Sequence, residues 1–176
     1  MRIISGSHRG RTIVPPRNFR ARPTTDFAKE SLFNVLNNIT EIEDAEVLDL
    51  FAGTGSISFE FASRGAKKID AVELNSVHYA FIQETAKKFG FTQIRAIKTH
   101  AIKFIEFCSV TYDIIFADPP YEMENVNEIP DMIFKNNLLN QDGLLILEHS
   151  DSYNFNEHSR FVNSRTYGSV NFTFFK

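Results

Sequence analysis

The residues with the clearest chemical meaning are Ala117–Tyr121, which read Ala-Asp-Pro-Pro-Tyr. They follow an apolar segment, residues 112–116, that is typical of a buried strand. They would therefore lie at the carboxyl edge of a sheet, where α/β folds bind ligands. Two consecutive prolines cannot donate hydrogen bonds and hold the chain extended, which leaves the carbonyl of Pro119 free to face a substrate. The structural alternative is a proline-stiffened turn capped by Asp118.

This segment suits chemistry at the amino group of a nucleic-acid base. The lone pair of such an amine is delocalised into the ring, so the amine is a poor nucleophile. The Asp118 carboxylate and the Pro119 carbonyl can accept its two N–H donors, which frees the lone pair for attack on a sulfonium methyl group. Aspartate can also hold the positive charge that develops on nitrogen, and Tyr121 offers a ring face for a base that has left its stack. The predicted catalytic residues are Asp118, Pro119, Pro120 and Tyr121.

A second candidate site is the segment Leu48–Gly55, in which an apolar strand runs into a glycine turn and a helix. Gly53 and Gly55 let the backbone pass close to a ligand where a β-carbon would collide. A dinucleotide fingerprint would place its third glycine at Ser58, so the pattern does not favour a nicotinamide cofactor. Asp49, ahead of the turn, suits a ligand that carries a positive amino group.

A third feature is Glu73, at the end of the next predicted strand. A carboxylate at that strand end can accept both hydroxyls of a ribose. Taken alone, the glutamate could be an exposed strand-end residue and the glycine turn could be structural, but together they favour a nucleoside cofactor, S-adenosylmethionine. The predicted cofactor contacts lie on the glycine turn and the strand ends: Asp49, Phe51, Ala52, Gly53, Gly55, Glu73 and Leu74.

Alternating strand and helix segments must position these residues. Apolar segments predict strands at residues 46–51, 69–74, 93–97, 112–117 and 144–147. Helical spacing predicts helices at about residues 26–39, 56–65, 76–90 and 100–107 and from Pro130 onward, with Ser76 as one cap. Residues 160–167 and 169–174 alternate around Gly168 like a hairpin. The predicted fold class is therefore α/β, a doubly wound and mostly parallel sheet with an antiparallel strand added at its C-terminal end.

The charge is divided unevenly along the chain. Residues 1–22 carry six arginines and no acid, whereas residues 23–176 carry 13 basic residues against 22 acids. Because arginine favours phosphate contacts and base stacking, residues 1–22 are predicted to be an arm that contacts a polyanion; a solvated terminus is the alternative. Aliphatic residues with Gly6 and Gly10 as turns predict that residues 1–14 form a small β-hairpin.

Length and composition limit the classes of protein to which the chain can belong. A chain of 176 residues with 43% hydrophobic residues fits one globular domain. It has no apolar run of membrane length and no signal-peptide pattern, so we expect a cytoplasmic monomer. Cys108 cannot form a disulfide within the chain, and its apolar surroundings predict a small buried residue. No metal is expected, because four histidines lack metal-like spacing and are interpreted as structural: His8, His78, His149 and His158.

The chain resembles the bacterial 16S ribosomal RNA (guanine(966)-N(2))-methyltransferases over nearly its whole length. The resemblance rests on six segments: MRIISGSHRGR at residues 1–11, RPTTD at 22–26, LFNVL at 32–36, LDLFAGTGSISFE at 48–60, SRGA at 63–66 and ADPPY at 117–121. Adenine and guanine amino methyltransferases share the last motif. The basic RGR followed by RPTTD is much more particular to this family.

The resemblance implies a Rossmann-like class I methyltransferase fold with a seven-stranded sheet in residues 23–176 and an RNA-contacting arm in residues 1–22. The implied partner is 16S ribosomal RNA, free or within a small-subunit assembly particle. Similar proteins often carry an acidic residue or Asn near the adenine ring of the cofactor, where this chain has His100, either an adenine contact or a solvent-facing residue at a helix start. The residues implied to lie near RNA are Arg9, Arg11 and Arg22.

Two other functions stay open. An adenine-N6 methyltransferase acting on RNA or DNA would use the same Asp-Pro-Pro-Tyr chemistry. A sequence-reading DNA enzyme usually needs a recognition domain, for which 176 residues leave no room, and this favours a structured RNA. A non-catalytic RNA-binding ribosome-assembly factor is the second alternative, against which Asp118 and the glycine turn argue.

Overall fold

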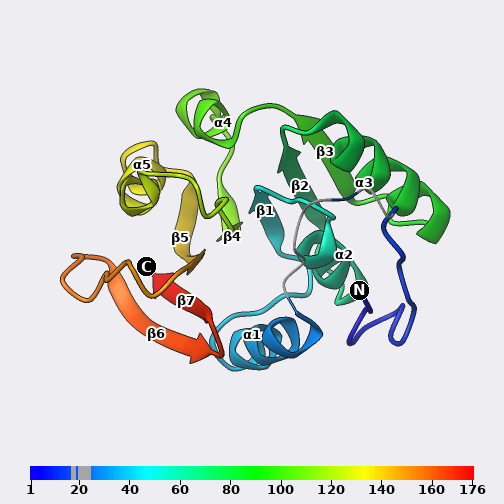
Figure 1. Cartoon of the computed structure of the whole chain (residues 1–176), viewed down its shortest axis with the longest axis horizontal. Coiled ribbons are helices and arrows are strands. Elements are labelled where there is room, and N and C mark those ends of the chain that lie inside the picture. Colours follow the sequence, from blue (N-terminus) through cyan, green and yellow to red (C-terminus); the bar gives the residue numbers. More distant parts are fainter. Residues whose placement is uncertain (17–18, 20–24) are drawn as a thin grey trace.

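A seven-stranded sheet forms the centre of the molecule in the computed structural model, which describes residues 1–16, 19 and 25–176 (Figure 1). Its strand order is β3-β2-β1-β4-β5-β7-β6. The neighbours among β1 to β5 are parallel, and β7 is antiparallel to both β5 and β6. The strands are β1 (Glu46–Leu50), β2 (Lys68–Glu73), β3 (Ile94–Lys98), β4 (Tyr112–Ala117), β5 (Leu139–His149), β6 (Phe161–Tyr167) and β7 (Val170–Phe175). The predicted mostly parallel sheet with an antiparallel C-terminal strand is confirmed.

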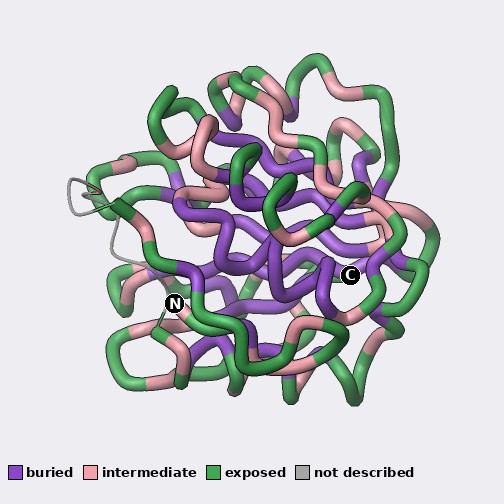
Figure 2. Tube along the Cα trace, turned by 90° about the vertical axis from the view of Figure 1, so that its right-hand side faces the viewer, coloured by how far each residue is buried: buried purple, intermediate pink, exposed green. Residues whose placement is uncertain are grey.

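Helices cover both faces of this sheet. The first three helices pack into one hydrophobic cluster and the α4 and α5 helices into another, on opposite sides of the strands. Figure 2 shows the buried segments running through the middle of the molecule, with exposed loops around them. The helices are α1 (Asp26–Ile39), α2 (Ser56–Ser63), α3 (Ser76–Phe89), α4 (Ala101–Phe107), the 3-10 helix η1 (Val126–Glu128) and α5 (Ile129–Lys135).

Two local predictions need correction. Ser76 does not cap α3 but is its first residue. The cap is Asn75, whose side-chain oxygen accepts from the amides of Val77 and His78. Asparagine is as good an N-cap as serine. Strand β5 is longer than the predicted 144–147, because Leu139 pairs with Tyr112 of β4 ahead of the apolar run, and the polar residues Glu148 and His149 pair with β7 after it.

The N-terminal hairpin is present and is part of the core. An antiparallel bridge joins Arg2 to Thr12, and the side chains of Ile3 and Ile13 are buried in the cluster that contains α1 and α2. At Gly6, φ is +82° and a β-carbon would lie 1.8 Å from the carbonyl oxygen of Ser63, so only glycine fits. The predicted division between residues 22 and 23 lies outside the described residues and stays a prediction.

A buried ion network fixes this hairpin on α2. All eight residues of α2 are buried, which leaves Glu60 with no exposed surface. Its carboxylate accepts from the amides of Ile4 (2.8 Å) and Ser5 (3.0 Å) and from Arg64 Nε (2.8 Å). The Nζ of Lys29, 1% exposed, lies 3.8 Å from Glu60 Oε2. Burial lowers the pKa of Lys29, and the charge of Glu60 opposes that shift.

Candidate active site

A pocket of about 600 Å³ opens at the carboxyl ends of β1, β2 and β4. The lining contains every predicted cofactor residue except Gly55, together with the whole predicted catalytic segment. Segments that lie far apart in the sequence meet here because parallel strands end at the same edge of the sheet. The predicted residues in the wall are Asp49, Phe51, Ala52, Gly53, Glu73, Leu74, Asp118, Pro119, Pro120 and Tyr121.

The turn after β1 is left-handed at three positions. The φ angles are +62° at Phe51, +55° at Gly53 and +75° at Gly55. A β-carbon on Gly55 would lie 2.9 Å from the ring of Phe59 and 3.0 Å from Ile82. Glycine at position 55 is therefore required by the backbone and by packing under the turn, whereas Gly53 forms part of the pocket wall.

Glu73 connects the glycine turn to the beginning of α3. Its Oε2 accepts from the Gly53 amide and its Oε1 from the Asn75 amide, each over 2.7 Å. A carboxylate oxygen can accept more than one hydrogen bond, so both oxygens keep acceptor capacity toward the pocket. The two backbone donors hold the carboxylate in one orientation, as binding of a diol requires.

Asp49 supplies an acidic group at the base of the pocket. It is 1% exposed, and its Oδ2 accepts from the hydroxyl of Ser58 over 2.5 Å. Burial raises the pKa of Asp49 to about 7, and the charge of Glu73 adds to the shift. This carboxyl group therefore exchanges its proton near neutral pH, and a cationic ligand would favour its ionised form.

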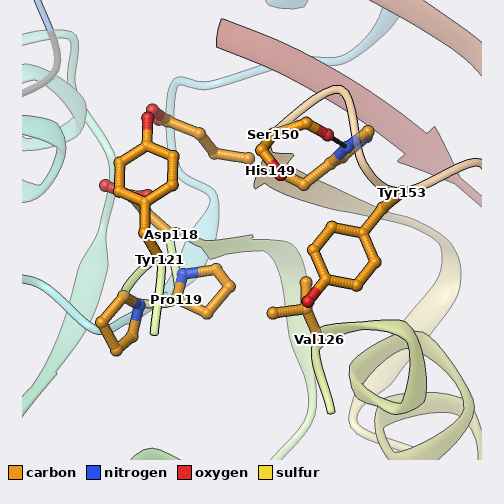
Figure 3. A pocket seen from close by; sticks show the side chains of 9 residues that line it. Asp118, Pro119, Tyr121, Val126, His149, Ser150 and Tyr153 are labelled. Atoms are coloured by element: carbon orange, nitrogen blue, oxygen red, sulfur yellow. Dashed lines mark hydrogen bonds between the residues drawn. The ribbon is translucent and has the colours of Figure 1, made fainter. Parts of the chain in front are cut away.

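Asp118 lies where the large pocket adjoins a smaller one. The smaller pocket is lined by residues 118–121 and by Val126, Tyr153 and residues 148–150. Figure 3 shows Asp118 and Tyr121 on one side of it and Val126 and Tyr153 on the other. Burial raises the pKa of Asp118 well above its ordinary value, and the charges of Glu148 and Asp49 raise it further.

Two of the predicted RNA contacts, Arg9 and Arg11, line neither pocket. Arg9 and Arg11 are exposed on the N-terminal hairpin, and Arg22 lies outside the described residues. The hairpin approaches the large pocket at its first residue, because the hydroxyl of Thr54 in the pocket wall donates to Met1 Sδ over 3.4 Å.

Sequence reasoning missed several lining residues. His78 lines the large pocket, while Glu148 and His149 line the small one. His100, for which the sequence left an adenine contact and a solvent-facing position open, also lines the large pocket. His78 Nδ1 lies 3.8 Å from Glu73 Oε1. His149 is held by Ser150 and Thr173, and burial lowers its pKa. Glu148 and His149 could have been found from their position at the end of β5, since the same strand-end position led to Asp118 and Glu73. Cys108 is only partly buried, contrary to the prediction.

The described part of the chain contains neither a metal-like cluster of side chains nor a helix of membrane-spanning character. No group of three or more His, Cys, Asp or Glu side chains among those residues could hold a metal ion. None of the helices described above is long and apolar enough to cross a membrane.

The comparisons with known proteins agree with this geometry. The whole chain, residues 1–176, matches the family model described as conserved hypothetical protein 95. Ribosomal RNA small subunit methyltransferase D of Escherichia coli (strain K12) is 33% identical over 150 residues, which is 84% of this chain and 74% of the relative. The protein of the same name from Haemophilus influenzae is 32% identical over 152 residues, covering 84% and 78%.

A solved structure shares the fold over its full extent. An Escherichia coli protein described as a candidate methyltransferase matches with a TM-score of 0.87 and 25% identity, covering 99% of this chain and 96% of that one. The resemblance found in the sequence is thereby confirmed. The chain belongs to the conserved hypothetical protein 95 family and is a relative of the ribosomal RNA small subunit methyltransferase D proteins.

Proposed function

We propose that this chain transfers a methyl group from S-adenosylmethionine to N2 of a guanine in 16S ribosomal RNA. The observation that carries the proposal is the position of Asp118, in the walls of two adjoining pockets at the carboxyl edge of the sheet. The larger pocket suits the cofactor. A base rotated out of its stack would enter beside Asp118 and Tyr121, which line both pockets, because the smaller pocket alone, at about 20 Å³, is too small to hold it. The names of the relatives support small-subunit RNA as the substrate.

The large pocket fits S-adenosylmethionine in size and in chemistry. Its volume of about 600 Å³ lies within the usual range for small-molecule sites. Glu73 is oriented by two backbone amides and suits the ribose hydroxyls, while the buried Asp49 suits the positively charged part of the ligand. When bound, S-adenosylmethionine supplies a methyl group activated by a positively charged sulfur.

The residues of β4 and the following turn act on the base. In the ionised form, the Asp118 carboxylate accepts one N–H of the target amine, and the carbonyl of Pro119 accepts the other. The two acceptors draw the nitrogen toward pyramidal geometry, so that its lone pair is available for attack. Asp118 also balances the positive charge that develops on that nitrogen and can take up its proton. Tyr121, 68% exposed, offers its ring to the base.

The test uses the purified protein, S-adenosylmethionine with a radiolabelled methyl group, and small-subunit RNA from cells that lack the gene. After digestion to nucleosides, we expect the label in N2-methylguanosine. Label in N6-methyladenosine would support the adenine alternative, to which the Asp-Pro-Pro-Tyr segment also points. RNA binding without label, on free RNA and on assembly particles, would support a non-catalytic assembly factor.

Glu73→Ala is expected to weaken S-adenosylmethionine binding by about 1.5–3 kcal/mol, the scale for hydrogen bonds to a charged group. The reason is the carboxylate that the Gly53 and Asn75 amides aim at the pocket. Isothermal titration calorimetry measures the change. Glu84→Ala, at an exposed position of α3, is the control and should bind as the parent does. Parent affinity in a folded Glu73→Ala protein would remove this residue from the site.

Cofactor affinity is expected to rise with pH through about 7. Because the pKa of Asp49 is about 7 in the ligand-free protein, below this pH the carboxyl group must release its proton to pair with a cation. The same shift lowers the free energy of unfolding of the ligand-free protein as the pH rises from 3.8, the ordinary pKa of this group, to about 7. Calorimetry in two buffers of different ionisation enthalpy should detect proton release on binding. Asp49→Asn should bind more weakly and release fewer protons; unchanged proton release would contradict this role.

The double variant Arg9→Ala, Arg11→Ala is expected to bind small-subunit RNA more weakly and to flatten the slope of log affinity against log salt by about 1–2 units. Point variants are better than deletion of the arm, because Ile3 and Ile13 belong to the core. Filter binding over a range of salt concentrations measures the slope. The control is Lys103→Ala, Lys135→Ala on α4 and α5, which pack on the other face of the sheet. Equal slopes for the two double variants would show that the hairpin does not contact RNA.

A further inference from the structure

The wall of the large pocket is acidic. No lysine or arginine is found among its described lining residues, whereas four of them carry carboxyl groups: Asp49, Glu73, Asp118 and Glu122. S-adenosylmethionine ends in an α-amino acid, which has a carboxylate beside its ammonium group. Asp49 suits the ammonium group, but the carboxylate would meet only like charges in this wall. Burying a charge is costly unless it is paired and hydrogen-bonded, so the carboxylate needs a partner of its own.

A buried ammonium group lies behind one part of this wall. Lys29 Nζ, on α1, donates to the hydroxyl of Ser56 over 3.1 Å and to the carbonyl oxygen of Arg2 over 2.7 Å. Ser56 is the first residue of α2, is 6% exposed and lines the large pocket. Ser56 is therefore in contact both with the ammonium group and with the space that the cofactor would occupy.

The direction of this hydrogen bond leaves a donor for the pocket. An ammonium group has donors but no acceptor, so the Ser56 hydroxyl accepts the bond and keeps its own proton to donate. This proton is not donated to any other residue in the described part of the chain. The hydroxyl of Thr54, also in the wall, instead donates to Met1 Sδ. Acceptance from a charged donor polarises the Ser56 hydroxyl and strengthens its own donation.

The charges around Lys29 suit an anion on the far side of Ser56. Two cations, Arg64 and Arg2, and two acids, Glu60 and Asp26, act on the charge of Lys29. Together with Lys29 the group has three cations against two carboxylates, so one positive charge is left without a counterion within it. A carboxylate bound at Ser56 would supply that counterion and favour the charged form of Lys29.

The Ser56 hydroxyl also lies near the residue that suits the ammonium group of the ligand. Asp49 accepts from the hydroxyl of Ser58, two residues after Ser56 on α2. A single carbon atom joins the ammonium group and the carboxylate of an α-amino acid, so their partners must be neighbours. Asp49 as an acceptor and Ser56 as a donor, both in the pocket wall at the beginning of α2, match such a pair.

We propose that the Ser56 hydroxyl, held and polarised by Lys29, donates to the carboxylate of S-adenosylmethionine. This inference rests on the proposed function and deepens it, because it assigns a partner to the amino-acid end of the cofactor. Ser56 touches the cofactor, whereas Lys29 is a positioning residue that acts through Ser56. The contact makes the large pocket favour a ligand with a complete amino-acid end over one that has lost its carboxylate.

The test removes the carboxylate from the ligand and the hydroxyl from the protein. The ligands are S-adenosylmethionine and its decarboxylated form, which keeps the sulfonium and the ammonium group. Ser56→Ala should weaken binding of S-adenosylmethionine by about 10–100-fold in Kd, measured by calorimetry, and should bind the decarboxylated form as the parent does. The acidic wall acts on both proteins alike, so the ratio of the two changes isolates this contact.

Matched variants separate this contact from a general effect on α2. Ser76→Ala, at the exposed first position of α3, is the control and should bind both ligands as the parent does. Ser56→Thr keeps the hydroxyl and should keep the preference for the carboxylate. Ser56→Cys, whose thiol is a weak donor, should lose it and serves if Ser56→Ala does not fold. Thermal melts establish that each variant is folded.

The part played by Lys29 is measured in the parent protein, so it does not depend on a variant that folds. The nitrogen NMR signal of Lys29 Nζ should shift when S-adenosylmethionine binds and shift less when the decarboxylated form binds. A purely structural lysine would respond equally to the two ligands. Equal shifts would contradict the role given to Lys29.

The outcomes distinguish this inference from the proposed function. Binding of S-adenosylmethionine without methylation of small-subunit RNA would overturn the proposed function and leave the contact at Ser56 in place. An equal loss of affinity for both ligands in folded Ser56→Ala, or no loss for either, would overturn the inference alone. Loss of the preference for the carboxylate in folded Ser56→Thr would also count against it.

Discussion

Asp118→Ala is expected to lower the single-turnover rate of methyl transfer by about 10²–10³-fold, the loss typical for removal of one preorganised electrostatic group. The substitution removes the side-chain acceptor for the amine and leaves the carbonyl of Pro119 in place. RNA affinity should change little, because phosphate contacts supply most of it. Cofactor affinity should also stay near the parent value, because the ribose and the positive charge of the ligand have their own partners in Glu73 and Asp49.

A purely structural role for Asp118 makes a different prediction. Loss of a turn cap would cost about 1 kcal/mol of stability and leave the turnover of the folded fraction almost normal. Quenched single-turnover assays, read beside a thermal melt, separate the two. Asp151→Ala, an exposed carboxylate in the turn after β5, is the matched control and should react at the parent rate. A folded Asp118→Ala protein as fast as this control would refute the mechanism.

Glu60→Ala is expected to cost about 3–5 kcal/mol of unfolding free energy, the scale for breaking one side of a buried ion pair. The substitution leaves the ammonium group of Lys29 in the core without its carboxylate, and the amides of Ile4 and Ser5 without their acceptor. Urea unfolding measures the loss. Hydrogen exchange at those two amides should accelerate more than exchange in the central strands, because the hairpin is released first.

The control for this prediction is Glu106→Ala, at an exposed position of α4, which should stay within about 0.5 kcal/mol of the parent. A Glu60→Ala protein with the same stability as Glu106→Ala would mean that the buried network does not hold the hairpin. Slow hydrogen exchange at the amides of Ile4 and Ser5 in the Glu60→Ala protein would lead to the same conclusion.

The fold could be predicted because its signals are periodic and repeated. The buried parallel strands are short apolar runs, such as residues 46–51 and 112–117, separated by helical spacing and by glycine turns. The large pocket could be predicted for a related reason. Once the strands are parallel, Asp49, Glu73 and Asp118 must meet at one edge, whatever their separation along the chain.

The missed features depend on tertiary contacts that have no local pattern. Glu60 and Lys29 look like ordinary surface charges of two helices, because such residues are almost never fully buried unless they are paired. Their burial follows from the position of α2 between the sheet and the N-terminal hairpin. Glu148 was missed because β5 was predicted to end at residue 147, one position before it.

The roles of the predicted site residues stay predictions, although the structure brings most of them into one pocket. Gly55 is the one predicted residue that does not line this pocket. Glycine is required at position 55 because the backbone is left-handed there and the ring of Phe59 lies close by. The proposed RNA contacts of Arg9 and Arg11 depend on which face of the hairpin meets the RNA, and sequence spacing does not encode that face.

The central claim is that this chain methylates the amino group of a guanine in small-subunit RNA and does so through Asp118. The most direct test is mass mapping of modified nucleosides in small-subunit RNA from cells without the gene, complemented by the parent protein or by Asp118→Ala at matched expression. The account predicts one N2-methylguanosine that is absent without the gene, restored by the parent and not restored by Asp118→Ala. An identical nucleoside map in all of these cells, or full restoration by Asp118→Ala, would contradict it.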